Sequence, residues 1–147
     1  MSHLKRILLA EDDPHDVELT ITALAKRNLA NEVIVARDGE EALDYLYLRG
    51  PFESREPGNP AVVLLDLKMP KVNGVEVLKT IKADPALKQI PVVVLTSSRE
   101  DPDVVQCYQL GVNAYVVKPV DFHEFVDAVS EMGLFWGIIN VPPPSGS

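Results

Sequence analysis

Ala61-Val62-Val63-Leu64-Leu65-Asp66 is a run of five apolar residues that ends on a carboxylate. Other apolar runs also end on reactive polar side chains, namely at Glu11-Asp12, Thr96 and Lys118. In a parallel α/β sheet the carboxyl ends of the strands line one edge, and ligands bind in the crevice outside it. Side chains that are far apart in the sequence can therefore meet there. A pair of acids, a lone acid, a hydroxyl and an amine together suggest phosphate and a metal.

The length and composition fit one globular domain. The 147 residues are 46% hydrophobic and 24% charged, so a real core and little disorder are expected. A formal net charge of -8 disfavours nucleic acid and anionic membranes as partners, because both attract basic surface. Cys107 is the only cysteine, which excludes an internal disulfide, and a packing role on a helix face is predicted for it. The first apolar run is too short for a signal peptide or a membrane span, so a cytoplasmic location is expected.

Strand and helix patterns alternate along the chain. Short aliphatic runs predict strands at residues 7–10, 32–36, 61–66, 91–95 and 114–117. Helical spacing predicts helices from Asp16 to near Leu29, at residues 40–48, after Gly74, at residues 103–110, and from Asp121 onward. Residues 49–60 are rich in glycine and proline, and an extended surface loop is predicted there.

Five such strand–helix units predict a parallel sheet with helices on both faces, because right-handed crossovers place them there. We expect an open, doubly wound, flavodoxin-like α/β fold with strand order 2-1-3-4-5. In that order the first and third strands are neighbours at the switch point, so Glu11, Asp12 and Asp66 form one cluster.

Clustered carboxylates repel each other unless a cation lies among them. Magnesium suits such a site, because it takes oxygen ligands and leaves positions for water and phosphate. We expect Asp12 and Asp66 to bind the metal directly and Glu11 to act through water. The alternative is that Glu11, Asp12 and Asp13 only begin a turn before Pro14.

Beside a metal, the Asp66 carboxylate could attack phosphorus and form an aspartyl phosphate. Lys118 offers a cation and Thr96 a hydroxyl for the phosphoryl oxygens. Each has a structural alternative, since Thr96 could cap a helix and Lys118 could be a solvated strand end. No glycine-rich phosphate loop is present, so nucleotide binding lacks its usual cradle. The three histidines share no ligand spacing and are interpreted as surface residues: His3, His15 and His123.

Two motifs complete the pattern: Asp66-Leu67-Lys68-Met69-Pro70 followed by Gly74, and Tyr115-Val116-Val117-Lys118-Pro119. With the residues at the strand ends, they resemble the receiver domain of two-component response regulators over residues 4–130. The resemblance implies that Asp66 accepts a phosphoryl group from a histidine kinase. It implies a Mg²⁺ or Mn²⁺ site made by Glu11, Asp12, Asp66 and the backbone carbonyl of Lys68.

The same resemblance implies that Thr96 and Lys118 contact the phosphoryl group and that the peptide between Lys118 and Pro119 is cis. On phosphorylation the Thr96 hydroxyl would move to the phosphoryl group, and Tyr115 would rotate into the vacated space. This change would reach the surface of the fourth helix, fifth strand and fifth helix. The alternative for Tyr115 is an ordinary strand aromatic.

The insertion at residues 49–60 and the apolar tail resemble the single-domain regulators paired with phytochrome-type histidine kinases in bacteria. We expect a receiver domain at residues 1–131 and a tail at residues 132–147 that is apolar and then rich in proline and serine. Phe135 and Trp136 in the tail predict a homodimer centred on the fourth helix, fifth strand and fifth helix. The alternative is that the tail packs on its own domain. Output would pass to another protein, such as a phosphotransfer protein.

Two other functions compete. A haloacid dehalogenase-like phosphatase also uses an aspartyl phosphate with magnesium, but its nucleophile ends the first strand in a D-x-D motif, whereas Lys68 stands two residues after Asp66. A scaffold that works without phosphorylation would need none of the reactive set. We therefore expect a phosphoacceptor with no enzymatic turnover beyond its own phosphorylation and dephosphorylation.

Overall fold

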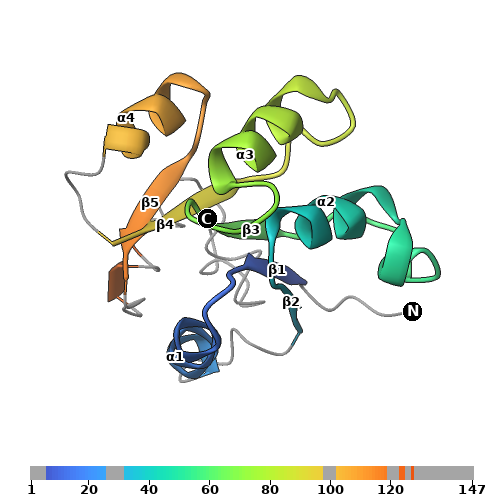
Figure 1. Cartoon of the computed structure of the whole chain (residues 1–147), viewed down its shortest axis with the longest axis horizontal. Helices are drawn as coiled ribbons and strands as arrows, with labels where there is room; N and C mark the ends of the chain where they lie inside the picture. The colour runs from blue at the N-terminus through green and yellow to red at the C-terminus, as the bar shows by residue number, and fades with distance from the viewer. Residues whose placement is uncertain (1–5, 26–31, 98–101, 119–122, 125–126, 128–147) are drawn as a thin grey trace, which may run out of the picture.

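Five parallel strands form the centre of the computed structural model, which describes residues 6–25, 32–97, 102–118, 123, 124 and 127 (Figure 1). The strands are β1 (Ile7–Ala10), β2 (Val33–Ala36), β3 (Val62–Asp66), β4 (Val92–Thr96) and β5 (Ala114–Val117). Their spatial order is β2-β1-β3-β4-β5, and every neighbouring pair is parallel. The predicted flavodoxin-like topology is confirmed.

Helices cover both faces of this sheet. They are α1 (Pro14–Ala25), α2 (Gly39–Tyr47), α3 (Gly74–Ala83) and α4 (Pro102–Gln109). In Figure 1, α2, α3 and α4 lie above the sheet and α1 lies below it. The predicted end of the first helix near Leu29 lies outside the described residues. So does most of the predicted last helix, of which positions 123, 124 and 127 are helical.

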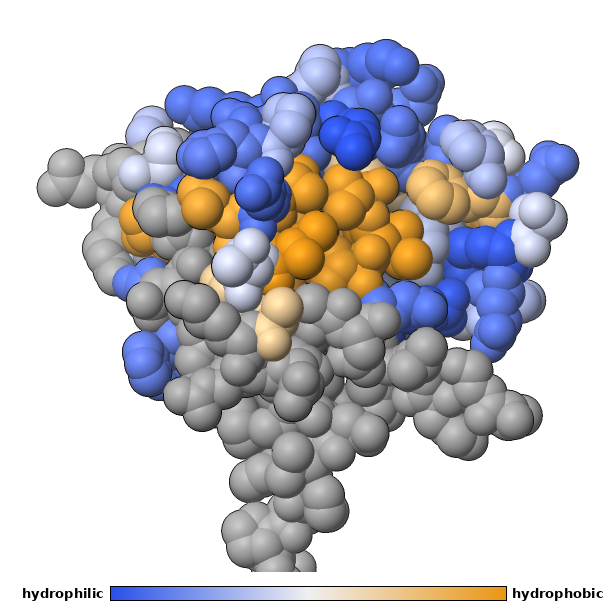
Figure 2. Space-filling model, turned by 90° about the horizontal axis from the view of Figure 1, so that it is seen from below, coloured by the Kyte–Doolittle hydropathy of each residue, from blue (hydrophilic) through white to orange (hydrophobic). Residues whose placement is uncertain are grey.

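The central strands are buried on both faces, which explains their continuous aliphatic sequences. Alternate residues of each strand point to opposite sides. On β3, Val63 and Leu65 belong to the core beneath α2 and α3, whereas Val62 and Leu64 belong to the core on the α1 side. Figure 2 shows apolar residues in the middle of the face seen from below. In the described part of the chain, no helix is both long and apolar enough to span a membrane.

The turn after β3 folds back closely on the strand end. Asn73 caps α3 by accepting a hydrogen bond from the Glu76 amide at 3.0 Å. The next residue, Gly74, lies so close to β3 that a Cβ there would be 2.3 Å from the Asp66 carbonyl oxygen. Only glycine permits this approach, so the chain that follows Asp66 is held against the edge of the sheet.

The predicted surface loop at residues 49–60 is more ordered than an irregular loop. It contains the 3₁₀ turn η1 (Gly50–Phe52), and Phe52 packs edge-on against Tyr45 at 5.2 Å between ring centroids. Arg55 donates to the backbone carbonyls of Tyr45 at 2.8 Å and Glu56 at 2.7 Å, and its guanidinium lies 3.9 Å above the Tyr45 ring. Arg6 donates to the Tyr45 hydroxyl at 3.2 Å and to the Glu56 carbonyl at 3.1 Å.

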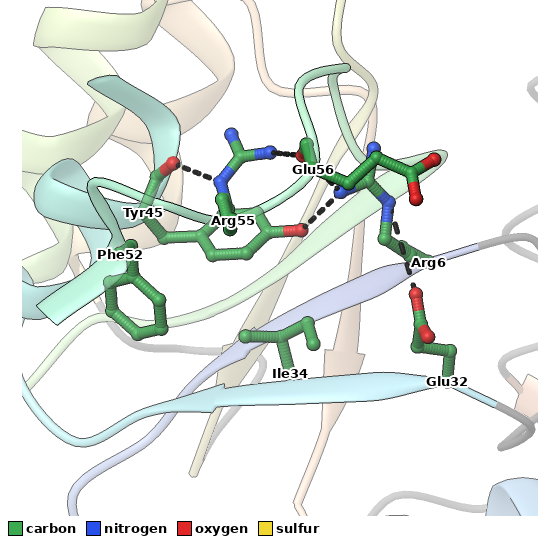
Figure 3. A pocket seen from close by; sticks show the side chains of 7 residues that line it. All are labelled: Arg6, Glu32, Ile34, Tyr45, Phe52, Arg55 and Glu56. Atoms are coloured by element: carbon green, nitrogen blue, oxygen red, sulfur yellow. Dashed lines mark hydrogen bonds and ion pairs between the residues drawn. The ribbon is translucent and has the colours of Figure 1, made fainter. Parts of the chain in front are cut away.

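These groups line a cavity of about 300 Å³ near the amino ends of β1 and β2 (Figure 3). Five hydrogen bonds from the two guanidiniums end on carbonyl oxygens of the loop itself, and a sixth ends on the Tyr45 carbonyl of α2. Among the described residues, Arg55 Nη2 is buried without a hydrogen-bond partner. The two arginines therefore hold the insertion in place, and the cavity lies between them and the sheet. It lies at the edge of the sheet opposite to the acids.

Candidate functional site

The carboxyl ends of four strands meet around one cleft of about 210 Å³. Glu11 directly follows β1, Asp66 ends β3, Thr96 ends β4 and Lys118 directly follows β5. The whole lining consists of Glu11, Asp12, Asp13, Asp16, Asp66, Leu67, Lys68, Leu95, Thr96, Ser97 and Lys118. The predicted meeting of these side chains at one edge is confirmed.

Three carboxylates form a tight cluster in this cleft. Glu11, Asp12 and Asp66 each place a carboxylate oxygen within 4.8 Å of the others. The register explains this proximity, because Ala10 of β1 pairs with Leu65 of β3, and Glu11 and Asp66 are the next residues. Glu11 and Asp66 are buried, whereas Asp12 is exposed. An all-oxygen set of this kind fits Mg²⁺ or Mn²⁺.

Lys118 is the cation that contacts the carboxylates of the site, and its side chain is only 17% exposed. Its Nζ lies 3.0 Å from Asp16 Oδ2, 3.2 Å from Glu11 Oε1 and 3.4 Å from Asp66 Oδ1. Its backbone amide donates to the Thr96 carbonyl at 2.7 Å, which fixes the end of β5 against β4. The alternative of a solvated strand end is therefore wrong for Lys118.

Asp16 is a member of the site that the sequence analysis did not single out. It lies in the first turn of α1 and makes the shortest of the three carboxylate contacts to Lys118. The helix start itself is capped by Asp13, whose Oδ1 accepts from the His15 amide at 2.8 Å. Asp13 is thus the helix cap, whereas Glu11 and Asp12 belong to the carboxylate cluster. Glu11 also accepts a hydrogen bond from the Asp13 amide at 3.2 Å. An acid in a helix turn that opens onto the same sheet edge was the available signal for Asp16.

The electrostatics of the cluster are unequal. Burial, with the nearby charge of Asp66, raises the pKa of Glu11 to about 7, against the opposing effects of the Asp13 amide and Lys118. Burial acts to lower the pKa of Lys118, but the hydrogen bond to Asp16 and the charges of Asp66 and Glu11 outweigh it and raise that pKa above its usual value. Lys118 is therefore charged at neutral pH, whereas Glu11 is the acid that a bound cation would help to ionise.

The remaining predicted residues have more varied surroundings. Thr96 is buried at the end of β4. Tyr115 on β5 is partly buried and contacts Tyr108 of α4, with ring centroids 5.9 Å apart and planes at 85°. The Lys68 amide approaches Asp66 Oδ1 at 3.4 Å, which places this backbone beside the cluster. Three predicted residues lie outside the described part of the chain: Pro119 of the predicted cis peptide, and Phe135 and Trp136 of the tail.

Comparison with known proteins identifies the class. A model of the response regulator receiver domain matches residues 7–130, and the chain therefore belongs to the response regulator receiver domain family. Response regulator Rcp1 of Synechocystis sp. is 40% identical over 132 residues, which cover 90% of this chain and 88% of Rcp1.

Two solved structures place the chain more narrowly within this family. The bacteriophytochrome response regulator AtBRR is 62% identical, with a TM-score of 0.85 and coverage of 90% of this chain and 95% of AtBRR. The Mn²⁺-bound form of response regulator Rcp1 is 37% identical, with a TM-score of 0.73 and coverage of 96% of this chain and 99% of Rcp1. Receiver domains are phosphorylated on an aspartate and bind Mg²⁺ or Mn²⁺ at an acidic pocket. The family resemblance predicted from the motifs is confirmed.

The raised pKa of Glu11 predicts that cation binding depends on pH. Below about pH 7 the carboxyl is neutral and attracts a cation weakly, whereas above it the carboxylate favours binding. Mg²⁺ affinity measured by calorimetry should therefore fall by about tenfold between about pH 8 and about pH 6, with proton release on binding. Glu11→Gln is the control and should remove most of this dependence. Equal wild-type affinities at the two pH values would contradict the prediction.

Proposed function

We propose that the chain accepts a phosphoryl group on Asp66 from a histidine kinase and signals through the resulting change of conformation. The surroundings of Asp66 are the observation that supports this proposal. This carboxylate is only 5% exposed, shares a cluster with two further acids and lies 3.4 Å from the ammonium of Lys118. A structural acid in a core needs a cationic partner, but it does not need two further acids beside it, whereas a phosphoacceptor that uses a metal does.

In the proposed reaction an Asp66 oxygen attacks the phosphorus, and the bond between phosphorus and the donor group breaks. Glu11, Asp12, Asp66 and the Lys68 carbonyl would hold Mg²⁺ or Mn²⁺, which would offset the repulsion between the carboxylates and the phosphoryl oxygens. Lys118 would donate to one phosphoryl oxygen, and the Thr96 hydroxyl to another. Their positions at the ends of β5 and β4 support these roles.

Thr96 and Tyr115 are the proposed switch. Movement of the Thr96 hydroxyl toward the phosphoryl group would leave space at the end of β4, and Tyr115 on the neighbouring strand would turn into it. Tyr115 contacts Tyr108 of α4 in the resting structure. Its rotation would break this contact and change the surface of α4 and β5, which is the kind of two-state element that a local charge change can bias.

We infer that the kinase is of the phytochrome type. The 62% identity to the bacteriophytochrome response regulator AtBRR supports this pairing. The chain matches 88% of the length of Rcp1, which supports a division into a receiver domain at residues 1–131 and a tail at residues 132–147. We also propose that it passes its signal to another protein. A phosphotransfer protein is one such partner.

We also propose a homodimer through the α4 and β5 face, with Phe135 and Trp136 of the tail contributing. Two apolar or aromatic side chains of α4 support it: Val105 is 61% exposed and Tyr108 is 47% exposed. Side chains of this kind are typical of protein interfaces.

Incubation with Mg²⁺ and acetyl phosphate tests the phosphoacceptor. Wild-type protein should gain one phosphoryl group by intact mass, and Asp66→Asn should gain none. Asp44→Asn, which changes a carboxylate on α2 outside the cleft, should label like the wild type. Steady hydrolysis of many phosphoesters would instead support the phosphatase, and a lack of labelling would support the scaffold. Labelling of Asp66→Asn would refute the assignment of Asp66.

Sedimentation velocity tests the dimer. At tens of micromolar the wild type should sediment as a dimer, and Val105→Asp should shift it toward the monomer, because a buried charge at an interface costs several kcal/mol. Leu19→Asp is the matched control, since Leu19 is an exposed apolar residue of α1. A wild-type monomer with and without a phosphate mimic would contradict the proposal.

A further inference from the structure

The ammonium of Lys118 has three N–H donors and three carboxylate neighbours. The shortest contact, 3.0 Å, is to Asp16, and the contacts to Glu11 and Asp66 are 3.2 and 3.4 Å. Glu11 and Asp66 also belong to the oxygen cluster that fits a metal, whereas Asp16 does not. Asp16 is therefore the carboxylate that Lys118 does not share with that cluster.

Asp16 and Lys118 come from opposite ends of the chain and from firmly placed backbone. Asp16 lies in the first turn of α1, where Asp13 accepts a hydrogen bond from its amide at 3.4 Å and from the His15 amide at 2.8 Å. The Lys118 amide is bonded to the Thr96 carbonyl. The side chain of Asp16 is 25% exposed and that of Lys118 17%, so water screens the pair less than a surface ion pair.

Phosphoryl transfer changes two of the three contacts. When an Asp66 oxygen forms a bond to phosphorus and the donor group departs with its electron pair, that carboxylate becomes the acyl part of a mixed anhydride and loses its charge. A phosphoryl oxygen then becomes the stronger acceptor for Lys118. Glu11 would help to hold the cation. The contact with Asp16 needs no change, because Asp16 neither gains nor loses a bond.

We propose that Asp16 is a positioning residue that holds the Lys118 ammonium at the point where the phosphoryl oxygens arrive, an inference that rests on the proposed function of Asp66. Without Asp16, the carboxylates left to hold the flexible Lys118 side chain would be Glu11 and Asp66, which take part in metal binding and phosphoryl transfer. A hydrogen bond between charged groups is strong enough that its loss should slow phosphorylation by about tenfold.

A faster labelling rate in the absence of Asp16 would identify a different role for this residue. If Asp16 competed with the phosphoryl group for Lys118, its removal would free the ammonium and accelerate labelling. The direction of the rate change therefore distinguishes an anchor from a competitor.

The experiment compares Asp16→Ala, Asp16→Asn and a control, Glu18→Ala. Glu18 is an exposed acid on the same helix, so the control removes the same charge outside the cleft. The initial rate of labelling by acetyl phosphate is measured at saturating Mg²⁺. The Nζ resonance of Lys118 is recorded by ¹⁵N NMR in unphosphorylated protein, because a purely structural role would not move it. Thermal unfolding verifies that each variant is folded.

We expect Asp16→Ala to label about tenfold more slowly than the wild type, and Asp16→Asn to lie between them, because asparagine keeps an acceptor oxygen but not the charge. Both should shift the Lys118 resonance, and Glu18→Ala should change neither quantity. If Asp16→Ala does not fold, the asparagine variant decides.

An unchanged or faster rate would overturn the inference, as would a slower rate with an unaltered Lys118 resonance. If the wild type and Glu18→Ala both fail to label, the proposed function fails. In that case the NMR comparison still tests the contact between Asp16 and Lys118.

Discussion

The site depends on the ion pairs that the Lys118 ammonium makes with the carboxylates of Glu11, Asp16 and Asp66. Buried carboxylates at such distances cannot all stay ionised without a cation. One ammonium compensates only part of the negative charge, and the raised pKa of Glu11 reflects burial together with the remaining charge of Asp66. The same incomplete compensation makes the cleft attractive to a divalent cation. A phosphoryl group on Asp66 would redistribute these charges, so the cluster can respond to phosphorylation.

The fold brings these groups together through strand order and close backbone packing. Because β1 and β3 are neighbours in matched register, Glu11 and Asp66 leave the sheet side by side. Gly74 holds the chain after Asp66 against the strand end, and the bond from the Lys118 amide to Thr96 aligns the ends of β4 and β5. At the opposite edge, Arg6 and Arg55 clamp the insertion that leads into β3. The proline-rich segment therefore adds order beside the sheet without entering the cleft.

Much of this arrangement could be predicted from the sequence. Aliphatic runs of strand length predicted the ends of β1, β3 and β4 to within one residue, because a short and continuous aliphatic run is typical of a buried parallel strand. The topology then placed Glu11, Asp12 and Asp66 together. Asp16 was missed because an acid near a helix start is usually explained by the helix itself, and its partner Lys118 lies 102 residues away. The clamp at residues 49–60 was missed because contacts from arginine to backbone carbonyls have no sequence period.

Lys118 and a bound metal would neutralise the same carboxylates, and the Mg²⁺ affinity of Lys118→Gln measures this overlap. Calorimetry at about pH 8.5 limits competition from protons for Glu11. Removing the ammonium removes a repulsion between it and the metal, so the variant should bind Mg²⁺ about tenfold more tightly than the wild type. Unchanged or weaker binding by a folded variant would contradict the claim that Lys118 and the metal neutralise the same carboxylates.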